Sequence, residues 1–194
     1  MSGFMSLAVR EGAPATQVLG DWSRVSGFAG YSGQAYSPAG DKGRFVLPPA
    51  FRKAVKESSG GAKTLCLAKH ERWNCLVGFG LSRRAELEQQ LDREEENAFR
   101  AGRTDFDRDL RSLQLFGFTE VPFDDSGRFI MPEHLRTLGK VGDGLYFQGG
   151  GRFFTIWSPE ELARMGAGWE SAQAACLHLV AEAAAKGKGK EGGE

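Results

Sequence analysis

The residues of this chain best suited to chemistry lie in a thirteen-residue phrase that occurs twice. Residues 40–52 read GDKGRFVLPPAFR, and residues 124–136 read DDSGRFIMPEHLR, 84 positions further along. Each copy places an arginine, Arg44 or Arg128, directly after a glycine that permits a tight bend. An arginine held by such a turn on a β-scaffold can bind a phosphate, or a guanine through two hydrogen bonds. The phrase is therefore a candidate nucleic-acid contact.

The two copies differ in their acidic residues. In the second copy Asp124 lies four residues before Arg128, so its carboxylate could reach across the bend and orient the guanidinium. A plain surface ion pair between them, worth under about 1 kcal/mol, is the simpler interpretation of a single copy. The first copy has Gly40 at the acidic position and Asp41 one residue later. The first copy also has Lys42 beside Arg44. Because both copies contain Gly-Arg-Phe, we favour a nucleic-acid contact over a plain surface ion pair for these arginines.

The sequence carries no motif of a known catalytic centre. It lacks GxSxG, a Walker loop, GxGxxG after a strand and HExxH. Cys66, His70 and Cys75 are close in the sequence but lack the paired spacing of a zinc site. These cysteines and Cys176 are better interpreted as buried small apolar residues. We therefore expect no enzyme, no metal, no cofactor and no small-molecule substrate.

The composition limits the class of partner and the location. The 194 residues contain 25 Lys+Arg and 25 Asp+Glu, so the net charge is zero. This balance disfavours a general polyanion binder, but it leaves room for a local basic patch. No run approaches the ~18–20 apolar residues of a membrane helix, and the N-terminus does not resemble a secretory signal. We expect a cytoplasmic protein without membrane contact.

The repeated phrase lies within two similar series of elements. Each half is expected to run β-turn-β-α-β-turn-β, because proline pairs and glycines bound short β-rich segments. Residues 82–112 predict a pair of charged helices broken near Gly102, with an apolar stripe along them. Ser158 and Pro159 predict a helix start, and residues 167–185 predict a helix.

From about Tyr31 to Glu161 the sequence resembles the MraZ family of bacterial transcriptional regulators. The resemblance rests on the Gly-Arg turns, the strand-Pro-helix segments, the helical linker and the GGGRFFTIW ending. It implies an α+β fold of two tandem AbrB-like swapped-hairpin β half-domains, which form a pseudo-two-fold, β-barrel-like unit with a helical linker and a C-terminal helix. The expected divisions are a flexible extension (1–29), half-domain 1 (30–80), linker (81–114), half-domain 2 (115–161), C-terminal helix (162–185) and disordered tail (186–194).

The resemblance also implies a function. Members bind double-stranded DNA at direct repeats upstream of their own division and cell-wall genes, as ring-shaped homo-oligomers, usually as repressors, without a cofactor and in association with the nucleoid. An oligomeric protein-interaction module of the antitoxin-like AbrB type is the alternative. By position, the DNA-binding side chains would be Lys42, Arg44 and Arg128. The supporting residues of the motif would be Asp41, Gly43, Asp124 and Gly127. With its added Lys42, the first copy is expected to carry more of the DNA contact.

Overall fold

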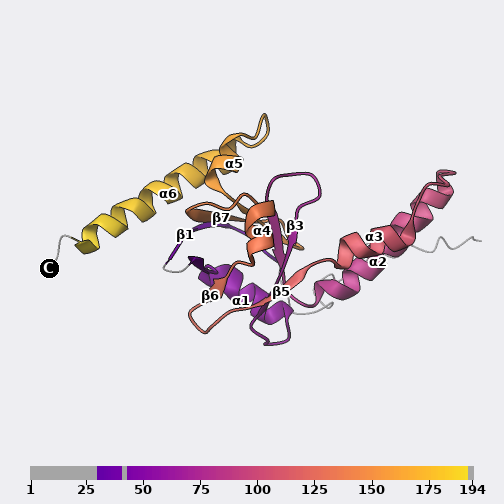
Figure 1. Cartoon of the computed structure of the whole chain (residues 1–194), viewed down its shortest axis with the longest axis horizontal. Coiled ribbons are helices and arrows are strands. Elements are labelled where there is room, and N and C mark those ends of the chain that lie inside the picture. Colours follow the sequence, from indigo (N-terminus) through magenta and orange to yellow (C-terminus); the bar gives the residue numbers. More distant parts are fainter. Residues whose placement is uncertain (1–29, 41–42, 192–194) are drawn as a thin grey trace, which may run out of the picture.

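The computed structural model describes residues 30–40 and 43–191, with side chains up to residue 187 (Figure 1). The first half contains β1 (Gln34–Pro38), β2 (Arg44–Val46), α1 (Pro49–Ser58), β3 (Thr64–Lys69) and β4 (Leu76–Phe79). The second half contains β5 (Thr119–Pro122), β6 (Arg128–Ile130), α4 (Glu133–Leu138), β7 (Gly144–Gly149) and β8 (Phe154–Trp157). Between them lie α2 (Arg83–Arg100) and α3 (Arg108–Phe116), and α5 (Pro159–Ala163) and α6 (Glu170–Glu191) follow.

These elements follow the order expected from the sequence, and two details differ. Ser158 does occupy the N-cap of α5, but its hydroxyl donates to the Glu160 carboxylate instead of accepting a backbone N–H. The last helix runs to Glu191, so residues 186–191 are helical and the tail expected there is wrong over that range. The alanines that precede residue 186 favour the helix, and its i→i−4 hydrogen bonding continues past them, which outweighs the low helix propensity of the glycines in residues 186–191. The extension expected at residues 1–29 lies outside the described residues.

The two halves interleave in one antiparallel sheet of strand order β1-β7-β8-β4-β3-β5. The first strand of each half pairs with the third strand of the other half: β1 with β7, and β5 with β3. Even the register is equivalent, because Pro38 lies opposite Gly144 and Pro122 lies opposite Thr64. If each strand is replaced by its equivalent in the other half, the same strand order results, read from the opposite edge of the sheet. The sheet therefore has a pseudo-two-fold axis between β4 and β8.

The described strands do not close into a barrel, so the β-barrel-like unit implied by the family resemblance is not confirmed. Among the described strands β1 and β5 are the edges of the six-stranded sheet, and β2 and β6 form a separate two-stranded antiparallel ribbon. Each strand of this ribbon has three residues. Phe45 lies directly opposite Phe129 in it. Equivalent residues of the repeat thus meet at the pseudo-two-fold axis.

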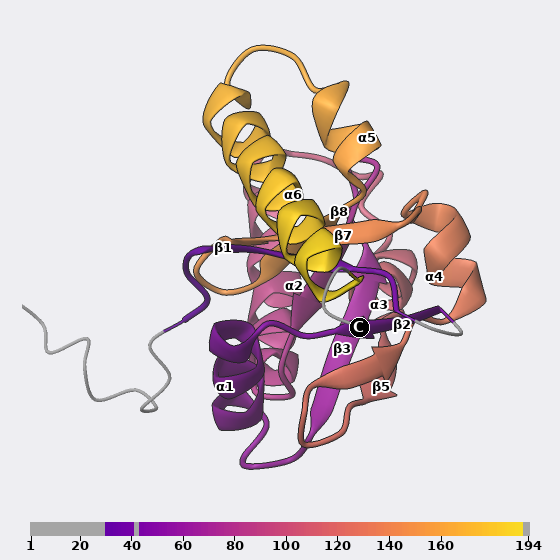
Figure 2. The ribbon, with the colours of Figure 1, turned by 90° about the vertical axis from the view of Figure 1, so that its left-hand side faces the viewer.

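The central strands of the six-stranded sheet are buried on both faces, and the ribbon covers one of these faces. On one face, Phe45 and Phe129 pack in a large apolar core with Phe51, Phe147 and Phe154. On the other, α5 and α6 lie across the sheet (Figure 2) and enclose a second cluster. Alternate side chains of β7 and β8 feed the two cores, as strand geometry requires. The ribbon therefore rests on the first core and faces outward.

Two helical segments extend from opposite ends of the molecule (Figure 1). One is α6, and the other is the hairpin of α2 and α3, which we call the arm (residues 83–116). The apolar stripe expected along the arm is only partly covered. Leu87 and Leu91 are buried, whereas Phe99, Leu110 and Leu113 are 85%, 53% and 73% exposed.

Candidate nucleic-acid interface

The ribbon of β2 and β6 separates its side chains into an inner and an outer face. Phe45 and Phe129 are buried beneath it, with ring centroids 6.2 Å apart. The flanking residues point the other way, since successive side chains of a strand alternate. The outer face consequently carries Arg44 opposite Ile130, and Arg128 opposite Val46. Both arginines are exposed. The structure thus brings together two candidate residues that are 84 positions apart in the sequence.

A shallow groove flanks the ribbon on each side, and both arginines line both grooves. One groove is bounded by Ser37–Gly40 of the first half, and the other by Val121–Asp124 of the second half. These segments are equivalent in the repeat, so the grooves are related by the pseudo-two-fold axis. The arrangement presents two similar concave surfaces, each lined by both arginines.

The carboxylate of Asp124 holds the turn of the second copy through the backbone. Its Oδ1 accepts hydrogen bonds from the Ser126 N–H at 2.9 Å, the Ser126 hydroxyl at 2.7 Å and the Arg128 N–H at 2.8 Å. These hydrogen bonds lower the pKa of Asp124, and the bond from the Ser126 hydroxyl has the largest effect. The ion pair considered between the side chains of Asp124 and Arg128 is not among those of the described residues. The carboxylate positions the strand that carries the guanidinium and leaves the guanidinium itself available.

The glycine of each turn is required by conformation and by space. Gly43 and Gly127 have φ of +69° and +85°, a region that side chains rarely adopt. A Cβ on Gly127 would lie 2.7 Å from the carbonyl oxygen of Leu47 and 3.1 Å from the side chain of Arg52. A Cβ on Gly43 would lie 3.2 Å from the guanidinium of Arg136. Each turn is therefore packed against the other half of the protein.

Arg52 and Arg136 are functional candidates that the sequence reasoning missed. They occupy equivalent positions, match outright in the repeated phrase and are half-buried beneath the opposite turns. The signal was their identity in both copies. Neither has an ion pair with another described residue, and the same holds for Arg44 and Arg128. Four arginines thus surround the ribbon without an acidic partner among residues 30–40 and 43–187.

Two of the predicted site residues, Asp41 and Lys42, lie outside the described residues. Nearby, Asp125 forms an ion pair of 2.5 Å with Lys63, which lowers the pKa of the Asp125 carboxyl. In the first copy the backbone N–H of Gly40 donates to the carbonyl of Arg44 at 2.8 Å. The same bond in the second copy joins Asp124 to Arg128 at 3.0 Å. The backbone of the two turns is therefore closed in the same way.

The cysteines are placed as small apolar side chains. Cys66, Cys75 and Cys176 are buried and unbridged. Burial raises the pKa of the Cys66 and Cys75 thiols to about 12, so both are protonated at neutral pH. Within the described part of the chain, no three His, Cys, Asp or Glu side chains are grouped to hold a metal ion. None of the helices described there is both long and apolar enough to span a membrane.

Fold and site together define a protein of two interleaved, repeated α+β halves that present arginines on a shared outer ribbon. Comparison with known proteins gives several relatives that carry one description, transcriptional regulator MraZ. The protein of Gluconobacter oxydans is 32% identical over 123 residues, covering 63% of this chain and 71% of the relative. That of Roseiflexus sp. RS-1 is 32% identical over 119 residues, covering 61% and 74%. No family model matches.

A more distant relative, from Solidesulfovibrio magneticus, is 28% identical over 132 residues, which is 67% of this chain and 78% of its own length. On this similarity the chain belongs to the MraZ family of transcriptional regulators. The family membership expected from the repeated phrase is confirmed.

Proposed function

We propose that the protein is a sequence-specific DNA-binding transcriptional regulator that represses its own operon. Its targets are direct repeats upstream of its own gene, in the division and cell-wall gene cluster, and it acts in the cytoplasm at the nucleoid. The observation that carries the proposal is the outer face of the ribbon. There, Arg44 and Arg128 are exposed, lie on adjacent strands and have no acidic partner among the described residues.

An arginine without an internal carboxylate is free to neutralise a phosphate or to bind a base edge. In this proposal Arg44 and Arg128 make those contacts, and Lys42 adds charge to the first copy. Gly43, Asp124 and Gly127 hold the turns, with Asp41 beside the first. A narrow two-stranded ribbon has a suitable shape, since the major groove of DNA admits one. We infer that the first copy carries more of the DNA contact.

The proposal includes a ring-shaped homo-oligomer, supported by the arm. Its exposed apolar side chains, Phe99 and Leu113 among them, are of the type that subunit contacts cover. Several subunits bound to successive repeats would add their contacts through effective concentration. This accounts for DNA binding by a chain whose net charge is zero.

The test is fluorescence anisotropy with a DNA fragment taken from upstream of the gene, for wild type, Arg44→Ala, Arg128→Ala and the double variant. We expect nanomolar to micromolar binding that weakens steeply with salt, because bound phosphates release counterions. Each arginine that contacts a phosphate should lower the slope of log K against log[salt] by about 0.9. Arg100→Ala is the matched control, since this arginine is exposed on the arm and pairs with Glu96 at 3.2 Å.

The variants also separate the regulator from the interaction module. Loss of DNA binding by the double variant, with an unchanged elution volume in size-exclusion chromatography, supports the proposal. Equal binding and equal salt slopes for wild type and double variant would place the DNA contact elsewhere. Absence of DNA binding by an intact wild-type oligomer would favour the interaction module.

A further inference from the structure

A cavity of about 270 Å³ lies away from the ribbon, between the β3–β4 turn and the arm. Its apolar wall includes Phe79 of β4, Leu87 of α2 and Phe153. Its polar rim includes Lys69, His70 and Arg72 from the turn, and Gln90 and Gln114 from the arm. An apolar cavity with a few convergent polar groups is the usual form of a small-molecule site. Its volume lies just below the range of about 300–1,000 Å³ that is typical of such sites.

Arg83 lines the cavity and is poorly satisfied there. Its side chain is only 16% exposed. A guanidinium has five N–H donors, and its one carboxylate contact among the described residues is with Glu86 at 3.4 Å. The charge lies over the rings of Phe79 and Phe153, at 5.6 and 5.4 Å from their centroids. Such contacts offset only part of the cost of burying a cation, and burial lowers the pKa of Arg83.

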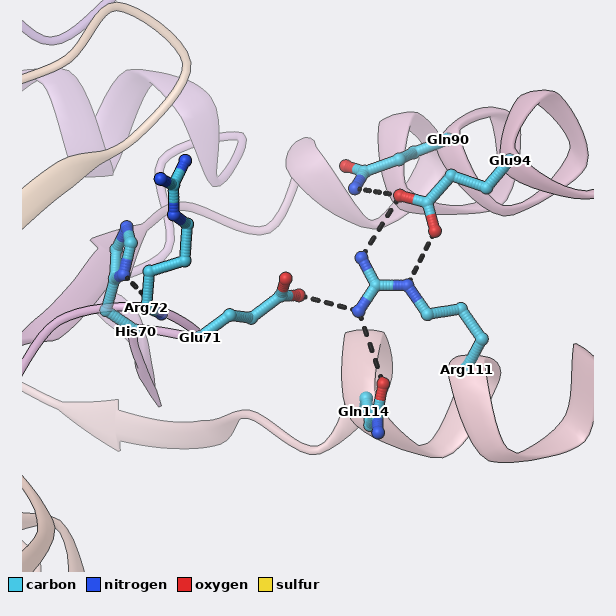
Figure 3. Close-up of polar contacts among 7 residues, drawn as sticks. All are labelled: His70, Glu71, Arg72, Gln90, Glu94, Arg111 and Gln114. Carbon is cyan, nitrogen blue, oxygen red and sulfur yellow. Dashed lines mark hydrogen bonds and ion pairs between the residues drawn. The ribbon is translucent and has the colours of Figure 1, made fainter. Parts of the chain in front are cut away.

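The rim adds positive charge because Glu71, the acidic residue in the cavity lining, is already paired with an arginine of the arm. Glu71 reaches across to Arg111 of α3, at 2.7 Å, as Figure 3 shows. The Lys69 ammonium donates to the carbonyl oxygens of His70, at 2.9 Å, and Trp73, and has no ion pair with a described carboxylate. Burial lowers the pKa of His70, so its ring is neutral at pH 7. The net charge around the cavity is positive.

The two glutamines leave hydrogen-bonding groups available at the arm side of the cavity. The amide nitrogen of Gln90 donates to Glu94 at 2.8 Å, and the amide oxygen of Gln114 accepts from Arg111 at 3.3 Å (Figure 3). The amide oxygen of Gln90 and the amide nitrogen of Gln114 have no partner among the described residues. They provide one acceptor and one donor.

We propose that this cavity binds a small organic anion, with its carboxylate or phosphate on Arg83 and its apolar body against the apolar lining that includes Leu87 and Leu115. The anion completes the hydrogen bonding of a buried guanidinium, which is the strongest polar interaction the cavity offers. Because the wall comes from both the sheet and the arm, the bound anion joins these two parts. It stabilises the arm in its present position. The inference does not depend on DNA binding.

The test compares phenylacetate with its neutral analogue 2-phenylacetamide, which has the same shape, by isothermal titration calorimetry on the full chain. We expect phenylacetate to bind wild type at least about tenfold more tightly than the amide, and to raise the melting temperature. Arg83→Met, which keeps the apolar stem, should lose at least about tenfold in affinity for phenylacetate. Arg84→Met is the matched control, because Arg84 is the next residue of α2 but is exposed and pairs with Glu120 outside the cavity.

A second variant guards against misfolding of the first. Gln90→Trp fills the rim from the half-exposed side of α2 and should abolish phenylacetate binding while Arg83 is intact. Equal affinity for the acid and the amide would overturn the proposal, and so would wild-type affinity in both Arg83→Met and Gln90→Trp. Absence of binding by wild type of both phenylacetate and phenyl phosphate, up to about 10 mM, would also overturn it.

Discussion

The packing of each turn against the opposite half predicts a graded series of glycine variants. Gly33, Gly43 and Gly127 all have positive φ, of +83°, +69° and +85°. An alanine at each position therefore incurs a similar backbone cost of about 1–2 kcal/mol. The space around the three differs. A Cβ at Gly33 meets nothing within 4 Å, whereas one at Gly127 lies 2.7 Å from the Leu47 carbonyl oxygen. The loss of stability in Gly127→Ala beyond that in Gly33→Ala therefore measures the contact between the halves.

The magnitude follows from what must move at Gly127. The clash is with backbone, and the Leu47 N–H donates to the Gly127 carbonyl at 2.7 Å, so a shift also strains this hydrogen bond. Overpacking costs about 1–3 kcal/mol, and a weakened hydrogen bond about 0.5–1.5 kcal/mol. We expect Gly127→Ala to lower the free energy of unfolding by about 2–4 kcal/mol more than Gly33→Ala. Gly43→Ala should fall between, because its neighbour at 3.2 Å is the flexible end of Arg136.

The assay is urea denaturation followed by tryptophan fluorescence at one fixed protein concentration, since association of subunits would add to stability. Unchanged m-values would show that the variants alter stability and not the extent of unfolding. If Gly127→Ala is no less stable than Gly33→Ala, the turn does not pack against the other half as described. The reasoning about Arg52 would then fail with it.

Four further predictions concern the ribbon and the arm. Phe45→Ala should lower the free energy of unfolding by about 3–5 kcal/mol in urea, because the side chain is fully buried. Because the pKa of Asp124 is lowered in the folded protein, its carboxylate stabilises the fold at pH values above the usual aspartate pKa of about 3.9, and this stabilisation is lost as the pH falls through the lower folded pKa. Asp124→Asn should therefore flatten the pH dependence of the free energy of unfolding in that acidic range. Gly40→Asp supplies the missing acceptor for the first turn and should be more stable in urea than Gly40→Ala. Arg111→Met removes the bonds to both carboxylate partners and should speed hydrogen exchange in residues 83–116.

The order of elements could be predicted because local chemistry determines it. Pro48 and Pro49 end a strand and begin a helix at once, and Gly139 ends the helix of the second half. The pairing between halves was not predictable in the same way. The register of β1 on β7 and of β3 on β5 depends on which strands meet in three dimensions, and no local pattern contains that. The family resemblance suggested exchange between the halves, and its β-barrel-like detail is not confirmed.

The role of Asp124 shows the same limit at the site. A spacing of four residues across a bend brings a carboxylate within reach of both the guanidinium and the backbone N–H of Arg128. Only the conformation of the turn decides between them, and the structure has the backbone bond at 2.8 Å. For Arg52 the sequence did contain the signal, since it matches Arg136 in the repeat. Its meaning required knowing that each arginine lies under the turn of the other half.

The net charge of zero hides a segregation that bears on function. In the arm, several basic side chains are paired: Arg108 with Asp92 and Glu95, at 2.7 and 2.5 Å, and Arg111 with Glu94 at 2.6 Å. The arginines around the ribbon have no such partners among the described residues. Since paired charges cancel within a few ångströms and unpaired ones do not, the ribbon carries local positive charge that the described acidic side chains do not cancel by ion pairing. A net charge of zero therefore excludes a uniformly basic surface. It does not exclude a local polyanion-binding site, because acidic residues that balance the charge of the whole chain can pair with basic residues away from that site, as they do in the arm.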